Sequence, residues 1–150
     1  MKLLIALGIA AFGFIVKELL QKPRVFISFD HSEDVKYKRL LQAWNANPKF
    51  KFEFDSRGPD IAIASSNDGV IKAALTKKLK QASHLLVLVG KESHKSRWMK
   101  WEIEKAKELK LKIVAVKISK ANISPDCLHE SGTVWVSSFQ SKRIEAALNQ

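Results

Sequence analysis

A single carboxylate lies on the apolar face of a predicted helix near the middle of the chain. The stretch SRWMKWEIEKAKELK, residues 96–110, consists largely of strong helix formers, and Ser96 is its expected N-cap. At about 100° of rotation per residue its apolar side chains share one arc, and Glu102 falls within that arc, roughly 40° from Trp98. The other two glutamates of the stretch point elsewhere. A glutamate in this position either forms a structural ion pair or supplies negative charge where water is scarce.

The chain around this helix alternates apolar strands with amphipathic helices. Strands are expected at 24–29, 49–54, 84–90, 112–118 and 133–137, and further helices at 32–44, from Ser65/Ser66 to about 81, and near 139–149. The run HLLVLVG at 84–90 is continuously apolar, as a central parallel strand covered by helices requires. The pattern predicts a flavodoxin-like three-layer α/β fold with a five-stranded parallel sheet in the order 2-1-3-4-5.

This fold brings several polar residues to one edge of the sheet. Open parallel sheets bind ligands at the carboxyl ends of their strands, near the point where the strand order reverses. Phe29 and Asp30 end the first predicted strand, and Asp55 follows the second. Ser93 lies in the loop after the third strand, and Glu102 lies in the first turns of the helix that leaves this loop. We therefore expect the buried-face carboxylate to lie at a ligand-binding crevice.

Several familiar chemistries lack their residues in this sequence. There is no G-x-G-x-x-G and no G-x-x-x-x-G-K-[ST], which excludes a glycine cradle for a dinucleotide or a triphosphate. A phosphoacceptor receiver domain needs an aspartate at the end of the third strand, where this chain has Val89-Gly90-Lys91. The histidines lack metal-ligand spacing, so no metal is expected. Cys127, the single cysteine, has no evident base partner and is expected to be structural.

The charge of the chain indicates an anionic partner. A net charge of +11 over 150 residues suits a membrane surface, a phosphorylated small molecule or nucleic acid. The lysines are spread along the chain, as on solvated helix faces, so nucleic acid is the unlikely partner among these. A single cysteine favours a reducing compartment.

The first twenty residues form a separate hydrophobic segment. Apolar residues and glycines run from Leu3 to Val16, which as a helix would span about 21 Å of the roughly 30 Å hydrocarbon core. Leu19 and Leu20, with snorkelling lysines, extend that span. We expect residues 1–22 to form a single-pass membrane anchor and residues 23–150 a domain on the cytoplasmic side, where the flanking lysines and Arg24 favour it. A cleaved signal peptide is the alternative.

Two stretches resemble a TIR domain. RVFISFDHSED opens the domain, and SHKSRWMKWEIEKA is similar to the family pattern S-x-x-S-x-W-x-x-x-E, represented here by Ser93, Ser96, Trp98 and Glu102. In detail the chain looks most similar to the TIR-like proteins of bacterial Thoeris antiphage systems, over residues 24 to about 149. With the expected anchor, the resemblance to a bacterial family implies a location at a bacterial inner membrane, and it also implies a possible defence-system partner protein.

The resemblance also implies a reaction. TIR domains with this glutamate cleave the nicotinamide N-glycosidic bond of NAD, and some make a cyclic ADP-ribose-type signal. NAD would then be a substrate, with no other cofactor. It implies Glu102 as the catalytic residue and the following as substrate-binding residues: Phe29, Asp30, Asp55, Ser93 and Trp98. Trp98 alternatively packs in the core. Residues 55–65 correspond to the BB loop through which such domains self-associate, and many TIR domains only assemble, so a non-catalytic, membrane-linked assembly module is the alternative function.

Overall fold

The sheet has the predicted topology. The computed structural model describes residues 22–32, 34–56, 67–130 and 132–150. Its elements are β1 (Arg24–Ser28), α2 (Val35–Asn45), β2 (Glu53–Ser56), α4 (Asp68–Lys80), β3 (His84–Val89), η1 (Ser93–Lys95), α5 (Arg97–Glu108), β4 (Lys112–Lys117), η2 (Asp126–Leu128), β5 (Val134–Val136) and α6 (Ser141–Leu148). All strand pairs are parallel and the order is β2-β1-β3-β4-β5, which confirms the flavodoxin-like prediction.

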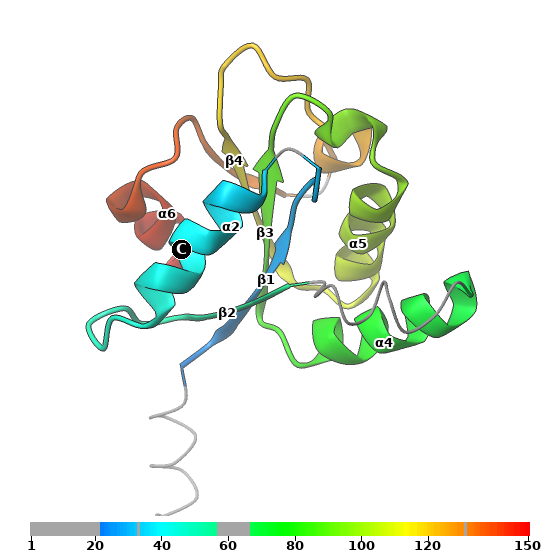
Figure 1. Cartoon of the computed structure of the whole chain (residues 1–150), viewed down its shortest axis with the longest axis horizontal. Coiled ribbons are helices and arrows are strands. Elements are labelled where there is room, and N and C mark those ends of the chain that lie inside the picture. The colour runs from blue at the N-terminus through cyan, green and yellow to red at the C-terminus, as the bar shows by residue number, and fades with distance from the viewer. Residues whose placement is uncertain (1–21, 33, 57–66, 131) are drawn as a thin grey trace, which may run out of the picture.

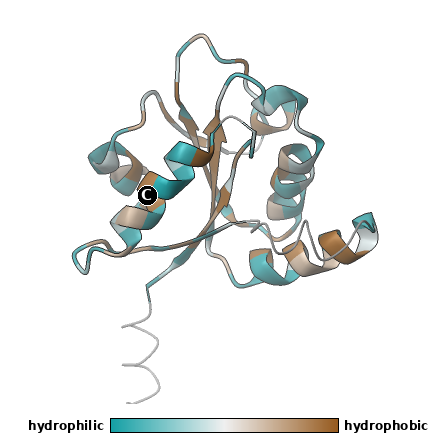
Figure 2. Ribbon diagram, in the orientation of Figure 1, coloured by the Kyte–Doolittle hydropathy of each residue, from teal (hydrophilic) through white to brown (hydrophobic). Residues whose placement is uncertain are grey.

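Helices cover both faces of the sheet. α2 and α6 pack on one face and α4 and α5 on the other, with the strands between them (Figure 1). All six residues of the central strand β3 are buried, as its continuous apolar sequence predicted. Figure 2 shows the strands as a hydrophobic centre and the helices with mixed surfaces. The helices therefore supply the apolar stripes that close the two cores.

Strand β1 contributes to both cores because successive side chains of a strand point to opposite faces. Val25 and Ile27 lie in the core under α2 and α6, together with Phe29 just beyond the strand. Phe26 lies in the core under α4 and α5. Ser28, two residues after Phe26, is fully buried and faces the same side as Phe26. This alternation decides which residues can meet a side chain from α5.

Strand β2 begins at Glu53, later than the predicted start at residue 49, and ends at Ser56. Its first ladder pair joins Glu53 to Arg24, and Arg24 is the first residue of β1. Residues 49–52 therefore precede the point where β1 begins and have no strand beside them. Their alternation is nevertheless real, since Phe50 and Phe52 are buried in the α2 side core.

Helix α5 has the boundaries and orientation that its sequence predicts. The Ser96 side chain caps it by accepting a hydrogen bond from the Met99 amide at 3.3 Å. Its buried residues are Met99, Glu102, Ile103 and Ala106. The glutamate therefore belongs to the sheet-facing side of the helix, as the angular argument required.

Two predictions fall partly or wholly on residues outside the described ranges. The hydrophobic segment, residues 3–20, lies outside them, as do Ser65 and Ser66, which were expected to open α4. Within the described residues α4 is capped by Asn67, whose side chain accepts from the Gly69 amide at 2.8 Å. No helix among the described residues is long and apolar enough to cross a membrane.

Candidate functional site

The Glu102 carboxylate lies against the end of β1. Only 1% of Glu102 is exposed, and the Ser28 hydroxyl, on a fully buried residue, donates a hydrogen bond to Glu102 Oε2. Ser28 is the last residue of β1, and it is level with Val87 on the central strand. The carboxylate therefore sits at the carboxyl side of the sheet, next to the switch point between β1 and β3.

Sequence and strand geometry together explain this pair. The alternation of β1 turns Ser28 toward α5, and the rotation of α5 turns Glu102 toward the sheet. A carboxylate removed from water is costly unless hydrogen bonds compensate it, and a hydrogen bond to a charged group contributes about 1.5–3 kcal/mol. Sequence analysis missed Ser28. A single serine at a core-facing position of an otherwise apolar strand was the available signal.

Ser93 holds the turn that follows β3. It is 1% exposed, its hydroxyl donates to the Leu88 carbonyl at 3.0 Å and it accepts from the Gly90 amide at 2.8 Å. The carbonyl of Val89, the last residue of β3, accepts from the Asn122 side chain at 2.8 Å. These bonds satisfy backbone groups that the ending strand leaves behind. Ser93 thus fixes the loop from which α5 begins.

A second buried carboxylate, that of Asp34, lies at the same edge. Asp34 is 5% exposed and immediately precedes α2. Its carboxylate packs so closely on Gly90 that a Cβ atom at position 90 would overlap it. Sequence analysis did not identify Asp34 as a site residue, because it expected a helix over 32–44 that includes this position, whereas α2 begins only at Val35. Gly90 directly after a buried strand was the available signal for a close approach.

Phe29 and Asp30 lie just beyond the end of β1, and each makes contacts of its own. Phe29 is 2% exposed and packs in the α2 side core, on the opposite face of the sheet from Glu102, where it stacks on His31 with ring centroids 4.2 Å apart. Asp30 Oδ1 accepts from the Ser32 amide at 2.8 Å and also from the Ser32 hydroxyl. Asp30 therefore shapes the loop between β1 and α2.

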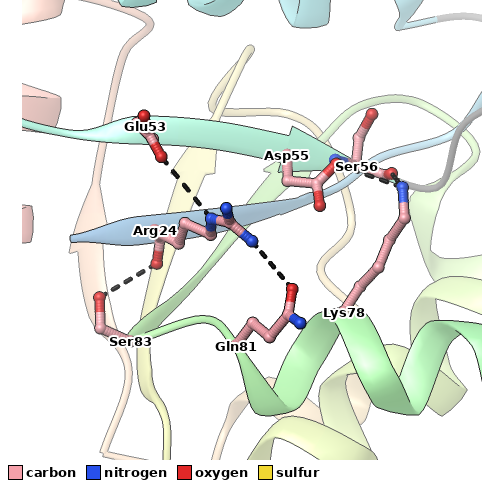
Figure 3. A network of polar contacts seen from close by, with 7 residues as sticks. All are labelled: Arg24, Glu53, Asp55, Ser56, Lys78, Gln81 and Ser83. Carbon is pink, nitrogen blue, oxygen red and sulfur yellow. Dashed lines mark hydrogen bonds and ion pairs between the residues drawn. The ribbon is translucent and has the colours of Figure 1, made fainter. Parts of the chain in front are cut away.

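Asp55 lies farther from the carboxyl edge of the sheet than Ser28 does, and it forms an ion pair with a lysine. It is level with Phe26, two residues before Ser28. Its Oδ1 is 3.3 Å from Lys78 Nζ on α4, which also donates to the Ser56 carbonyl at 3.0 Å (Figure 3). The structure therefore places Asp55 in an ion pair that ties the end of β2 to α4. Residues 57–66, which contain most of the expected BB loop, lie outside the described residues.

Trp98 is partly buried against the core under α4 and α5, and it also lines a cavity with residues of α4. Its ring packs edge to face on Trp101, with centroids 6.2 Å apart, and the Arg97 guanidinium lies 5.1 Å from its centroid. Arg97 in turn forms a double hydrogen bond to Asp68, at 3.0 and 3.1 Å. An open cavity of about 250 Å³ lies here, and its lining includes both tryptophans and Arg97. Glu102 is not among the described residues that line it.

Burial shifts the pKa of two other candidate groups. Burial raises the pKa of the Cys127 thiol, although the Lys107 charge opposes this, so the thiol stays protonated and is a poor nucleophile. Burial also lowers the pKa of His84, opposed by a backbone hydrogen bond at Leu148 and assisted by the Lys112 charge. His84 begins β3, at the edge opposite Glu102. Neither group belongs to the candidate site.

The structure therefore brings together only part of the expected set. Glu102 with Ser28, and Ser93 with Gly90 and Asp34, converge where β1 and β3 end. The Asp30 loop lies beside them, whereas Phe29, Asp55 and Trp98 face other surroundings.

Three comparisons relate the chain to known proteins. The family model described as Thoeris protein ThsB, TIR-like domain, matches residues 26–123. No curated protein matches the chain. The TIR domains in a structure of the activated Roq1 resistosome directly recognizing the pathogen effector XopQ match with a TM-score of 0.46 and 17% identity, over 65% of this chain and 60% of that chain. This chain thus spans less than two thirds of that one. A 3-dehydroquinate dehydratase-like protein from Bifidobacterium longum matches with a TM-score of 0.46 and 12% identity, over 86% and 94% of the two chains.

Proposed function

Because the chain belongs to the family of Thoeris ThsB TIR-like domains, we propose that it cleaves the N-glycosidic bond of NAD in a bacterial antiphage defence system. The observation that carries this proposal is the position of Glu102, a carboxylate only 1% exposed and hydrogen-bonded by Ser28 at the ligand-binding edge of a parallel sheet. Catalytic groups are commonly found where burial and specific partners perturb a charge.

The main requirement that the proposed reaction places on the protein is a negative charge near the ribose. The bond between C1′ of the ribose and the nicotinamide nitrogen breaks, and its electron pair leaves with neutral nicotinamide. The cation left on the ribose then takes the oxygen of water, which loses a proton, or a hydroxyl of the same molecule when a cyclic ADP-ribose-type product forms. A carboxylate in a dry site stabilises such an oxocarbenium-like transition state more strongly than one in water.

The proposed roles differ among the other residues. Ser28 is a positioning residue, because it acts on the reaction through its hydrogen bond to Glu102. Asp30 and Ser93 lie in the loops that follow β1 and β3, where a nucleotide would approach. Substrate contact by Phe29, Asp55 and Trp98 stays a prediction from the resemblance.

The decisive experiment measures NAD consumption by the full chain at high density on liposomes, with Glu102→Gln as the variant. This change removes the charge at nearly constant volume, so we expect turnover to vanish while thermal unfolding remains cooperative. Glu108→Gln is the matched control, because Glu108 lies on the same helix but is exposed and paired with Lys105 at 2.7 Å. Equal turnover by the wild type and Glu102→Gln would exclude Glu102 as the catalytic residue.

One observation favours a second function, a non-catalytic assembly module. The near-complete burial of Glu102 and its bond to Ser28 are also what a purely structural carboxylate needs. On this alternative the domain self-associates without turning over NAD, and Glu102→Gln alters stability alone. Self-association together with no nicotinamide release at any protein density would favour the module over the enzyme.

We further propose that residues 3–20 anchor the chain in a bacterial inner membrane, with the domain in the cytoplasm. The support is the length of the apolar run, the lysines that flank it, and the basic residues that open the domain. This location gives the domain access to cytoplasmic NAD and concentrates its copies on a surface, where weak contacts between domains suffice for assembly.

A further inference from the structure

The amino ends of the strands carry an unbalanced set of cations. In a parallel sheet all strands begin at one edge, so residues that precede or open strands lie near one another. Those cationic residues are Lys22, Arg24, Lys49, Lys51, Lys80, Lys110 and Lys112, which we call the basic edge. Six of them are exposed and Lys22 is half-buried. The acidic residues at this edge, among those described, are Glu53, 3.6 Å from Arg24, and Glu108, paired with Lys105.

Hydrogen bonds join several of the strand starts that carry the basic edge. The Arg24 guanidinium donates to Gln81 at 2.8 Å, and the Ser83 hydroxyl donates to the Arg24 carbonyl at 3.0 Å (Figure 3). The Lys112 amide donates to the Ser83 carbonyl at 3.3 Å. These bonds join the starts of β1, β3 and β4. Part of the backbone from which these cations project is therefore held by hydrogen bonds between elements.

The opposite edge of the sheet has no such excess. Its described loops and first helical turns carry cations interspersed with carboxylates: Lys36, Lys38, Lys91, Lys95, Arg97, Lys117, Lys120, Lys142 and Arg143, with Asp30, Asp34, Asp68, Glu92, Asp126 and Glu130. The cations of the basic edge are thus accompanied by fewer carboxylates than those of the opposite edge. A surface of one sign attracts counter-charged partners within about one Debye length, roughly 8 Å at physiological salt.

The place of the hydrophobic segment in the sequence, shortly before β1, indicates the kind of partner. Its last apolar residue is Leu20, and β1 begins at Arg24, so the connection spans at most about 14 Å. If residues 3–20 insert in a bilayer, this short connection holds the basic edge within reach of the headgroups. We propose that the basic edge docks on anionic lipid headgroups, so that the Glu102 edge faces away from the membrane. This inference rests on the proposed anchor and is independent of NAD cleavage.

Docking fixes an orientation as well as a location. The six residues of β3 separate the two edges of the sheet by about 20 Å. With the basic edge at the headgroups, the ends of β1 and β3 lie outside the surface layer, where a soluble dinucleotide can approach them. An apolar segment and a basic surface together also give the two signals that stable attachment generally uses.

Lysine acylation of the full chain on vesicles tests this orientation. The chain is reconstituted in phosphatidylcholine alone or mixed with phosphatidylglycerol, and a lysine-reactive ester is added from outside. We expect Lys51, Lys80 and Lys110 to react several-fold more slowly, relative to Lys91, Lys95 and Lys120 of the same molecules, only when phosphatidylglycerol is present. High salt should restore their reactivity. Equal ratios in the two lipids, or protection of the carboxyl edge instead, would overturn the proposal, as would failure of the full chain to associate with either vesicle.

Matched charge variants strengthen the test. The triple change Lys51→Gln, Lys80→Gln, Lys110→Gln should expose Lys49 to acylation on phosphatidylglycerol vesicles, whereas Lys91→Gln, Lys95→Gln, Lys120→Gln should leave Lys49 protected. All six lysines are exposed, so neither variant should unfold the domain. Protection by a soluble oligonucleotide but not by phosphatidylglycerol vesicles would assign the basic edge to nucleic acid and refute docking on lipid. None of these readouts depends on NAD turnover, so the two proposals fail separately.

Discussion

At the scale of single residues, the pair of Ser28 and Glu102 is the main feature of the site. We predict that Ser28→Ala lowers the free energy of unfolding by about 1–3 kcal/mol, because it deprives a buried carboxylate of a donor. NAD turnover should fall as well, with kcat affected more than KM. Ser56→Ala is the control, since Ser56 is also buried at a strand end but pairs with Ile27, whose side chain faces the opposite core. Chemical denaturation and steady-state kinetics check both effects, and wild-type kinetics in Ser28→Ala would contradict a positioning role.

His84 predicts how stability depends on pH. Burial holds its pKa below the ordinary 6.5, so the folded chain keeps it neutral while the unfolded chain binds a proton as the pH falls below that value. The unfolded state then holds more protons, and stability decreases as the pH is lowered from about 7.5 to about 5.5. His84→Gln should flatten this dependence, whereas His94→Gln, at an exposed histidine, should retain it. Denaturation curves across that range measure the difference. Parallel curves for the wild type and His84→Gln would refute it.

The residues of the site were only partly predictable from sequence. Helical periodicity predicted the burial of Glu102, because rotation alone turns it toward the sheet. Its partner was not predictable in the same way, since pairing Ser28 with Glu102 depends on how α5 crosses β1. The face that Phe29 occupies was predictable from strand alternation. Phe29 is three residues after Phe26, so its side chain is expected on the opposite face of the sheet from Phe26 and Ser28, and the structure has it there. The resemblance to TIR domains named Phe29 as a substrate-binding residue but did not indicate on which face of the sheet it lies.

At the scale of elements, local signals predicted what each element does and tertiary pairing decided where it starts. Ser96 predicted the start of α5, because a serine cap acts through a bond three residues away. The start of β2 was predicted too early, because alternation in 49–54 records burial and not the presence of a neighbouring strand. Alternation of strands and helices predicted a parallel sheet, and the structure confirms the flavodoxin-like order that was expected for it.

The left-handed residue just after α5 gives a prediction about the stability of the domain. Lys110 has φ +57, a left-handed conformation that costs a residue with a Cβ about 1–2 kcal/mol. The chain needs it there because the Leu111 amide turns back to the Ala106 carbonyl at 3.0 Å. Lys110→Gly should therefore raise the free energy of unfolding by about 0.5–1 kcal/mol, after the entropy that glycine loses. The same change at exposed Glu104, within the helix, should lower it by about 1 kcal/mol. Thermal or denaturant unfolding of both variants measures the contrast, and destabilisation by Lys110→Gly would contradict the argument.

At the scale of the whole molecule, the distribution of charge and apolar sequence gives the domain a direction. In the sequence the hydrophobic segment precedes β1, whose first residue belongs to the basic edge, and the Glu102 edge lies at the other end of this strand. Net charge in the sequence predicted an anionic partner, but only the parallel sheet shows that the seven cationic residues of the basic edge, among 26 in the chain, lie at one edge. A linear sequence spreads them over ninety residues, from Lys22 to Lys112.

The proposed anchor makes the last prediction. If residues 3–20 span the membrane with the domain inside, the full chain fractionates with membranes and resists alkaline extraction. A reporter fused after Gln150 is then active only if it functions in the cytoplasm. Ile9→Lys with Phe12→Lys should release the chain, because a lysine near the middle of a spanning helix costs about 2.5–3.5 kcal/mol. The pair Ile9→Leu and Phe12→Leu keeps the segment apolar and should leave it membrane-bound. A soluble periplasmic species shortened by about twenty residues would instead identify a signal peptide, and it would separate the domain from cytoplasmic NAD.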